Sequence, residues 1–243
     1  MSIATTAEYT VRDQERMQLA GRYFQWQADL AASAVGRRVI EVGCGLGNFT
    51  QHLIDREIVV ATDIESSCTA LLAARFPKSD NLVIHTASVL SPEFASMERY
   101  KPDSVVCLNV LEHVEDDTLA LHQMHHVLQA GGRVALIVPA FMALYGPIDR
   151  LLGHYRRYSK KSIVRLAHAT GFNVIALRYM NTVGCLGWWV NSHILRKTEQ
   201  SETQIKLFDR WVVPIMRRAE DVLPPPFGQS LFVILEKPMR SAQ

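Results

Sequence analysis

The stretch Glu41-Val-Gly-Cys-Gly-Leu-Gly47 decides the fold of this 243-residue chain. It continues the short apolar run at residues 38–42, which predicts a buried strand that leads directly into glycines. Glycine allows a tight turn and lets a ligand approach bare backbone at the start of a helix. A strand followed by such a turn is typical of nucleotide-binding α/β domains, in which the ligand is either a dinucleotide or S-adenosylmethionine.

Three details around the turn bear on this choice. The dinucleotide fingerprint GxGxxG needs a third glycine at position 48, where the chain has Asn48; its glycines lie at 43, 45 and 47 instead. A carboxylate at Glu41 would repel a pyrophosphate but would help to hold the ammonium of a methionine moiety. Asp63 ends the second predicted strand and can accept both ribose hydroxyls, a feature that both classes of site share. The first two details favour S-adenosylmethionine.

Outward from the turn, the pattern alternates between strand and helix, as in an α/β protein. The predicted strands are residues 38–42, 58–62, 82–85, 104–108, 133–138, 172–179 and 230–236. The predicted helices are residues 10–34, 48–56, 66–76, 115–129 and 159–170, the last of them capped by Ser159. This pattern predicts a Rossmann-like core over residues 36–180 and 228–238.

Two segments lie outside the alternation. Residues 1–35 predict an N-terminal helical cap, and residues 181–227 form an aromatic-rich insert between the last two strands. Ligands of open α/β sheets bind beyond the carboxyl ends of the strands, so these two segments are expected to cover the site as a lid.

Composition sets the broad class. Apolar residues make up 48% and charged residues 21% of the chain, as in ordinary globular proteins, and a net charge of +2 gives no reason to expect nucleic acid as a partner. The four cysteines are far apart, which favours a reducing, cytoplasmic location. The polar N-terminus has no signal-peptide core, and no apolar stretch reaches the roughly 20 residues of a membrane span.

Four motifs in order resemble the class I S-adenosylmethionine-dependent methyltransferases. They are Glu41-Val-Gly-Cys-Gly-Leu-Gly47, Thr62-Asp63-Ile64, Asn109-Val-Leu-Glu-His113 and Leu128-Gln-Ala-Gly-Gly132. The resemblance implies a single methyltransferase domain over residues 1–243. Its fold would be a seven-stranded, mostly parallel sheet with helices on both faces, an antiparallel last strand and a helical cap. S-adenosyl-L-methionine would be the cofactor and S-adenosyl-L-homocysteine the product.

The same resemblance assigns roles in the cofactor site. Gly43 and Gly45 would pack against the methionine part, beside Glu41, and Asp63 would hold the ribose. Ile64 and Val89 would enclose the adenine, and Ser88 or backbone would meet its amino group. The Asn109 carbonyl would meet the ammonium, with Val110 and Leu111 next to it. Tyr23 either closes over the cofactor or packs as a core aromatic.

The acceptor end is predicted on the loop after the fifth strand. Here Gly153-His-Tyr-Arg-Arg-Tyr158 resembles a bacterial subgroup with a Gly-His-x-Arg-Arg-Tyr segment. His154 is the leading candidate for a catalytic base, because histidine is the side chain best suited to exchange a proton at neutral pH, and Tyr158 is the second catalytic candidate. In the structural alternative, Asp149 pairs with Arg156 or Arg157 and only fixes the loop. A direct catalytic role for His113 is the less favoured reading.

No metal site is predicted. His122, His125 and His126 share a helix at i, i+3, i+4 spacing, but no acidic or cysteine ligand accompanies them, so a solvated face is expected. The leading function is methyl transfer to an oxygen or nitrogen of a small, secondary-metabolite-like acceptor by a monomer or homodimer. The alternatives are a lipid-linked or sugar-containing acceptor, a non-catalytic cofactor-binding protein and, last, a dehydrogenase.

Overall fold

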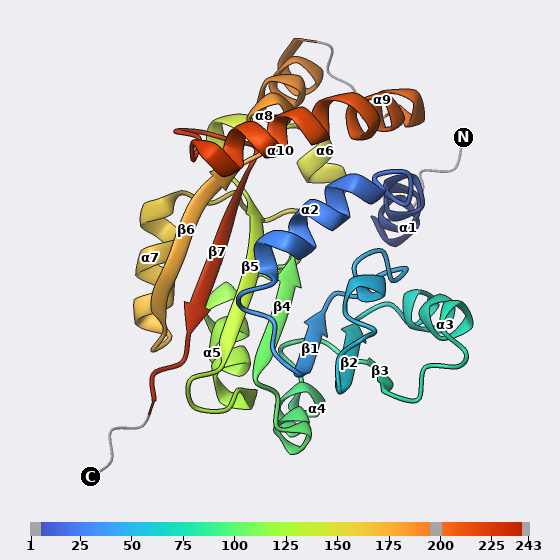
Figure 1. The fold of residues 1–243 in the computed structure, drawn as a ribbon, viewed down its shortest axis with the longest axis vertical. Coiled ribbons are helices and arrows are strands. Elements are labelled where there is room, and N and C mark those ends of the chain that lie inside the picture. The colour runs from blue at the N-terminus through green and yellow to red at the C-terminus, as the bar shows by residue number, and fades with distance from the viewer. Residues whose placement is uncertain (1–5, 195–200, 240–243) are drawn as a thin grey trace.

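A computed structural model describes residues 6–194 and 201–239. It contains one seven-stranded sheet in the order β3-β2-β1-β4-β5-β7-β6 (Figure 1). Strands β1 to β5 pair in parallel, and β7 runs antiparallel to both of its neighbours. The Rossmann-like fold expected from the sequence, with its antiparallel last strand, is confirmed. Residues 1–5 of the predicted N-terminal cap and 195–200 of the predicted insert lie outside the described residues.

The strands agree closely with the apolar runs of the sequence. They are β1 (Arg38–Val42), β2 (Ile58–Asp63), β3 (Leu82–Thr86), β4 (Ser104–Leu108), β5 (Arg133–Pro139), β6 (Asn173–Met180) and β7 (Ser230–Glu236). Among the described residues, the α-helices are α1 (Thr6–Met17), α2 (Gly21–Ala31), α3 (Ser66–Arg75), α4 (Pro92–Ala95), α5 (Asp117–Val127), α6 (Pro147–Leu151), α7 (Lys160–Ala169), α8 (Thr182–Trp189), α9 (Glu202–Leu207) and α10 (Val213–Val222).

The sheet is covered on both faces because successive residues of its strands point to opposite sides. Ile40 belongs to a core cluster that also contains Met124 of α5 and Ile163 of α7. Its neighbour Val39 belongs to a second cluster, with Trp26 of α2 and Met216 of α10. These two apolar layers fix the sheet, and with it the position of every loop at the carboxyl ends of the strands.

Two of the predicted helices differ in the structure. The predicted helix at residues 10–34 is two helices, α1 and α2, separated at residues 18–20 before Gly21. The predicted helix at residues 48–56 is a single 3-10 turn at Thr50–His52. There the Thr50 hydroxyl donates to the Glu41 carboxylate (2.7 Å), so the chain stays folded against the strand end instead of extending as a helix.

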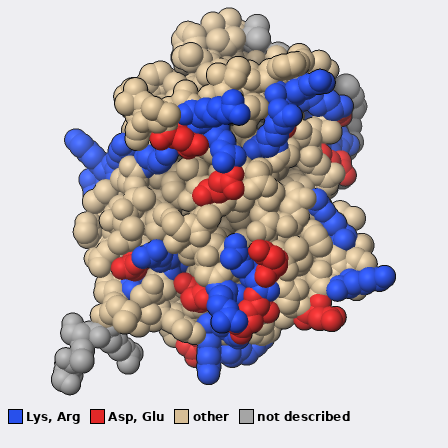
Figure 2. Space-filling model, in the orientation of Figure 1, with Lys and Arg blue, Asp and Glu red and all other residues tan. Residues whose placement is uncertain are grey.

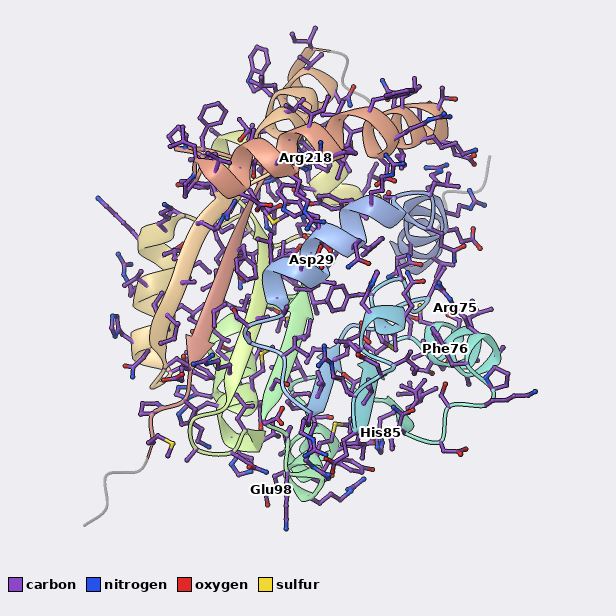
Figure 3. The ribbon with its side chains drawn as sticks, in the orientation of Figure 1. Asp29, Arg75, Phe76, His85, Glu98 and Arg218 are labelled. Carbon is purple, nitrogen blue, oxygen red and sulfur yellow. The ribbon has the colours of Figure 1, made fainter. Side chains whose placement is uncertain are left out.

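The insert is tied to both the sheet and the N-terminal helices. Figure 1 shows α8, α9 and α10 gathered beyond the carboxyl ends of β1 and β4, with α2 just below α10. Asp209, in the π-helical turn Phe208–Val212 that follows α9, accepts from the backbone N–H groups of Arg22 (3.2 Å) and Tyr23 (2.8 Å). Asp29 of α2, which Figure 3 labels, pairs with Arg217 of α10 (2.7 Å). The insert therefore satisfies orphan donors at the start of α2.

The surface offers no single-sign charged face in the view of Figure 2, where lysine and arginine lie among aspartate and glutamate. Among the helices that the structure describes, none is long and apolar enough to cross a membrane.

Candidate active site

A cavity of about 1020 Å³ opens at the carboxyl ends of β1, β2, β4 and β5. This is at the upper end of the roughly 300–1,000 Å³ typical of small-molecule sites, so it has room for a nucleoside cofactor and a second molecule. Nine of the predicted cofactor residues line it: Tyr23, Glu41, Gly43, Asp63, Ile64, Ser88, Val89, Asn109 and Val110. Gly45 and Leu111 do not line it, and Leu111 is fully buried in the core.

The glycine turn has the geometry that the sequence pattern requires. Gly43, Gly45 and Gly47 all have positive φ, of 73°, 50° and 78°. A Cβ on Gly43 would lie 2.3 Å from Cγ2 of Val110, so no larger residue fits there without a shift. Arg75, labelled in Figure 3, reaches from the end of α3 and donates to the Leu46 carbonyl (2.9 Å), which braces the turn from outside.

Glu41 lies at the base of the cavity and is only 3% exposed. Burial raises the pKa of this carboxyl to about 8, although the hydrogen bond from Thr50 opposes the shift. A buried carboxylate is costly unless a cation pairs with it. The ammonium of a methionine moiety is such a cation, so the residues at this position fit S-adenosylmethionine.

Asp63 ends β2 at the rim of the cavity. Its Oδ2 accepts from the Gly45 N–H (2.8 Å) and its Oδ1 from the Glu65 N–H (3.0 Å). Burial raises the pKa of Asp63, and these backbone hydrogen bonds partly counter the increase. The N–H groups of Gly45 and Glu65 therefore hold the Asp63 carboxylate in place, as the prediction that it binds the ribose requires.

The adenine side is apolar and open. Ile64 is 68% exposed although it lines the cavity, whereas Val89, which also lines it, is buried. An exposed isoleucine is apolar surface that a flat, apolar ring would cover. The Ser88 hydroxyl accepts from the Leu90 N–H (3.2 Å) and so orders the turn at this edge.

Asn109 follows β4 with a φ of 54°, a conformation that asparagine tolerates better than most residues. Its N–H donates to the Ile137 carbonyl of β5 (2.7 Å), which ends the strand pairing at this point. The chain therefore turns away from the sheet here, and the residues after it, Val110, Glu112 and His113, line the cavity.

His154 lines the same cavity, on the loop that follows α6. Its Nδ1 is 2.9 Å from Oδ1 of Asp149, which is fully buried. Arg157 binds the same carboxylate through Nε (2.8 Å) and Nη2 (3.1 Å), and its guanidinium lies over the Trp188 ring of α8 (4.8 Å). Burial alone would raise the pKa of Asp149, but the bonds from His154 and Arg157 outweigh it and lower that pKa.

The contacts of the structural alternative are present, and the catalytic role of His154 stays a prediction. Asp149 pairs with Arg157, as the structural alternative expected, and it also orients His154 toward the cavity. Arg156 is engaged elsewhere, with Asp117 (3.0 Å) and the Val114 carbonyl.

Tyr158, the second catalytic candidate, is placed outside the cavity lining. It is 3% exposed, and its hydroxyl donates to Asp117 (3.0 Å) and the Leu111 carbonyl (3.3 Å). Burial raises its pKa. In this position Tyr158 contacts the turn after β4 and does not line the cavity.

Two residues acquire a significance that sequence reasoning did not give them. Glu112 is 1% exposed and lines the cavity, and burial raises its pKa to about 7. The His113 ring meets the His154 ring edge to face, with centroids 4.5 Å apart, and burial lowers the pKa of His113 to about 4. The Glu-His pair of the fourth motif was visible in the sequence, but its contact with His154 depends on the fold.

The model of the family described as "Methyltransferase domain" matches residues 14–177. The chain belongs to this family. The methyltransferase is 34% identical over 100 residues to the ubiquinone biosynthesis O-methyltransferase of Alkalilimnicola ehrlichii, which covers 41% of this chain and 40% of that protein. It thus spans less than half the length of the curated relatives it matches.

Solved structures confirm the fold of the methyltransferase. A chain of the Haloferax volcanii complex between the Trm112 methyltransferase activator and a methyltransferase has a TM-score of 0.66 at 14% identity, covering 97% of this chain and 96% of that one. The N-methyltransferase NodS of Bradyrhizobium japonicum, solved with S-adenosylhomocysteine, has a TM-score of 0.53 at 14% identity, covering 93% and 86%. S-adenosylmethionine dependence follows from the family.

Proposed function

We propose that this methyltransferase transfers the methyl group of S-adenosylmethionine to an oxygen or nitrogen of a small-molecule acceptor. The observation that carries the proposal is the shared cavity: nine predicted cofactor residues line it, and so does His154, whose Nδ1 lies 2.9 Å from Asp149. The curated relatives are named as O-methyltransferases, which favours oxygen.

The cofactor supplies a methyl group on a sulfonium, and the S–C bond electrons return to sulfur when that group leaves. The chain's task is therefore to hold donor and acceptor in line at near-contact distance. Glu41 would pair with the ammonium, Asp63 with the ribose, and Ile64 and Val89 with the adenine.

At the acceptor end, His154 is the proposed catalytic residue. Asp149 already accepts from Arg157 and the Gly146 N–H, so it is ionised and receives the Nδ1 proton of His154. The lone pair of Nε2 is then available to take the acceptor's proton as the new bond to carbon forms. Tyr158 stays a weaker catalytic candidate, because only a movement of its loop would bring it to a ligand.

The two helical segments are proposed to act as caps on the core formed by residues 36–180 and 228–238. Tyr23 of the cap at 1–35 and Trp188 of the insert at 181–227 both line the cavity, so each segment would close one side of it. A cytoplasmic monomer or homodimer with no nucleic-acid partner remains our proposal.

A lipid-linked or sugar-containing acceptor is the second candidate, and one feature of α8 favours it. Trp188 lines the cavity, whereas Val183, Leu186 and Trp189 of the same helix are 44%, 57% and 47% exposed. Apolar side chains that continue from a cavity to the surface would suit an acceptor with a lipid tail. Methyl transfer to a short-chain analogue at the same kcat/KM as to the lipid-linked form would remove this candidate.

Turnover of the His154→Ala variant tests the proposed function. With an acceptor found by screening hydroxyl and amine compounds against labelled S-adenosylmethionine, we expect a loss of about 10²–10⁴-fold in kcat. Affinity for S-adenosylhomocysteine should be unchanged, because His154 lies at the acceptor end. Wild-type turnover would remove His154 from the mechanism. Cofactor binding without turnover on any acceptor would support the non-catalytic alternative.

A further inference from the structure

The strongest unassigned feature of the cavity is a cluster of Glu112, His113 and His154. Each offers one ligand atom, and these atoms all lie within 4.8 Å of one another. Glu112 and His113 belong to the turn that follows β4, and His154 to the loop that follows α6. All three line the cavity, so the cluster opens onto the space left for the acceptor.

In the part of the chain that the structure describes, one carboxylate oxygen of Glu112 is buried without a hydrogen-bond partner. The residue is 1% exposed, and among the described residues its Oε2 has no hydrogen-bond partner. Such a carboxylate is costly unless a cation reaches it. Arg157, the arginine of the neighbouring loop, binds Asp149 and the Ala140 carbonyl instead. A bound cation would satisfy the orphan oxygen.

The two histidines are oriented as metal ligands usually are. Nδ1 of His154 lies 2.9 Å from the Asp149 carboxylate, so a proton on Nδ1 leaves the lone pair on Nε2 as the ligand. His113 donates one ring N–H to the Leu152 carbonyl, which leaves its other nitrogen as an acceptor. A carboxylate or carbonyl behind each imidazole fixes the tautomer and strengthens the ligand, as in carboxylate–histidine–zinc sites.

We propose that Glu112, His113 and His154 bind a divalent first-row metal ion of the zinc class, with at least one coordination position open to the cavity. Two histidines and one glutamate are a ligand set of catalytic zinc sites, which keep such an open position. The site differs from the helix-face cluster of His122, His125 and His126, from which the sequence predicted no metal.

The role of the ion rests on the proposed function. An acceptor hydroxyl bound at the open position would have a lower pKa, so its proton would leave to water and its oxygen would be ready to form the bond to the methyl carbon. The ion would then occupy the Nε2 lone pair of His154, which takes a proton only in the metal-free protein.

Cobalt binding tests the site without any acceptor. Chelator-treated protein titrated with Co²⁺ should bind one ion per chain with a visible absorption band of an imidazole-bound site, and Zn²⁺ should displace it. His113→Ala and Glu112→Gln should each weaken Co²⁺ binding at least tenfold. The melting temperature of each variant checks that it is folded. The matched control is the double variant His122→Ala/His126→Ala on α5, which should bind like the wild type.

The proposal would be overturned if the wild-type protein bound no more Co²⁺ than the His113→Ala variant. So would binding that His113→Ala retains and the α5 control loses. The two proposals fail separately: Co²⁺ binding without methyl transfer would leave the metal site and remove the proposed function. If the protein bound no Co²⁺ and a chelator did not slow methyl transfer, the proposed function would stand and the metal site would be removed.

Discussion

The buried Glu41 carboxyl affects both the stability of the free protein and the proposed binding of the cofactor's ammonium. Its folded pKa of about 8 lies above the usual value of 4.5, so the folded protein holds a proton that the unfolded chain would release. The free energy of unfolding therefore falls as pH rises from about 4.5 to about 8. A cofactor ammonium would remove that cost by pairing with the carboxylate.

Glu41→Gln should consequently change stability and binding in opposite directions. At pH 8 we expect the free energy of unfolding of the cofactor-free variant to be about 1–3 kcal/mol higher than that of the wild type, because the variant buries no charge. Its affinity for S-adenosylhomocysteine should fall at least about tenfold, since a charged hydrogen bond is lost. Denaturation and calorimetry measure the two effects. At pH 5 the stability difference should be nearly absent; a variant that is less stable than the wild type at pH 8 would contradict this explanation.

Asp63 gives a second prediction at this scale. Asp63→Ala should weaken S-adenosylhomocysteine binding by about 1.5–3 kcal/mol, the usual value of a hydrogen bond to a charged group. Because Asp63 also accepts from the Gly45 and Glu65 N–H groups, the melting temperature should drop as well. Titration calorimetry measures the affinity, with Asp80→Ala on the exposed loop before β3 as control. An unchanged affinity would place the ribose elsewhere.

At the scale of elements, the contact of the insert with α2 is the most direct to test. Asp209 accepts from the Arg22 and Tyr23 N–H groups, so it caps a helix that belongs to a distant part of the chain. Asp209→Ala should lower the free energy of unfolding by about 1–2 kcal/mol, as other lost caps do. Thermal denaturation measures it. Asp221→Ala, which removes an exposed partner of Arg217 (3.7 Å), should cost far less. Equal losses in the two variants would argue against the cap.

The strands were predictable because each is a short, buried apolar run; β4 and β7 begin and end at the predicted residues. The single turn at Thr50–His52 was not, because its helical pattern is overridden by the bond from Thr50 to Glu41. The periodicity of apolar residues also predicted one helix where the structure has α1 and α2. The apolar spacing continues through residues 18–20, although the helical backbone is interrupted there.

That most of the predicted cofactor residues line one cavity was predictable for a related reason. These residues lie within short motifs at strand ends, and parallel strands bring such ends together. The acceptor end was only partly accessible: His154 was singled out, but its contact with His113 and the stacking of Trp188 on Arg157 join segments that are far apart in sequence. Such contacts depend on how loops pack, which local patterns do not determine.

At the scale of the whole molecule, the sheet is a scaffold that many functions share, so the argument for methyl transfer depends on the family and on the cavity. The cavity is lined by the buried Glu41 carboxylate, by Gly43 of the glycine turn, by the apolar Ile64 and Val89, and by His154, which contacts the buried Asp149. We propose that these residues give a bound cofactor one orientation, with its sulfur toward His154.

A crystal structure with S-adenosylhomocysteine tests that orientation most directly. We predict the adenine between Ile64 and Val89, the amino group near Glu41 and Asn109, and the sulfur facing the open space before His154. Adenine seated against His154, or a dinucleotide with its phosphates on Gly43 to Gly47 in a protein that does not bind S-adenosylhomocysteine, would contradict the account.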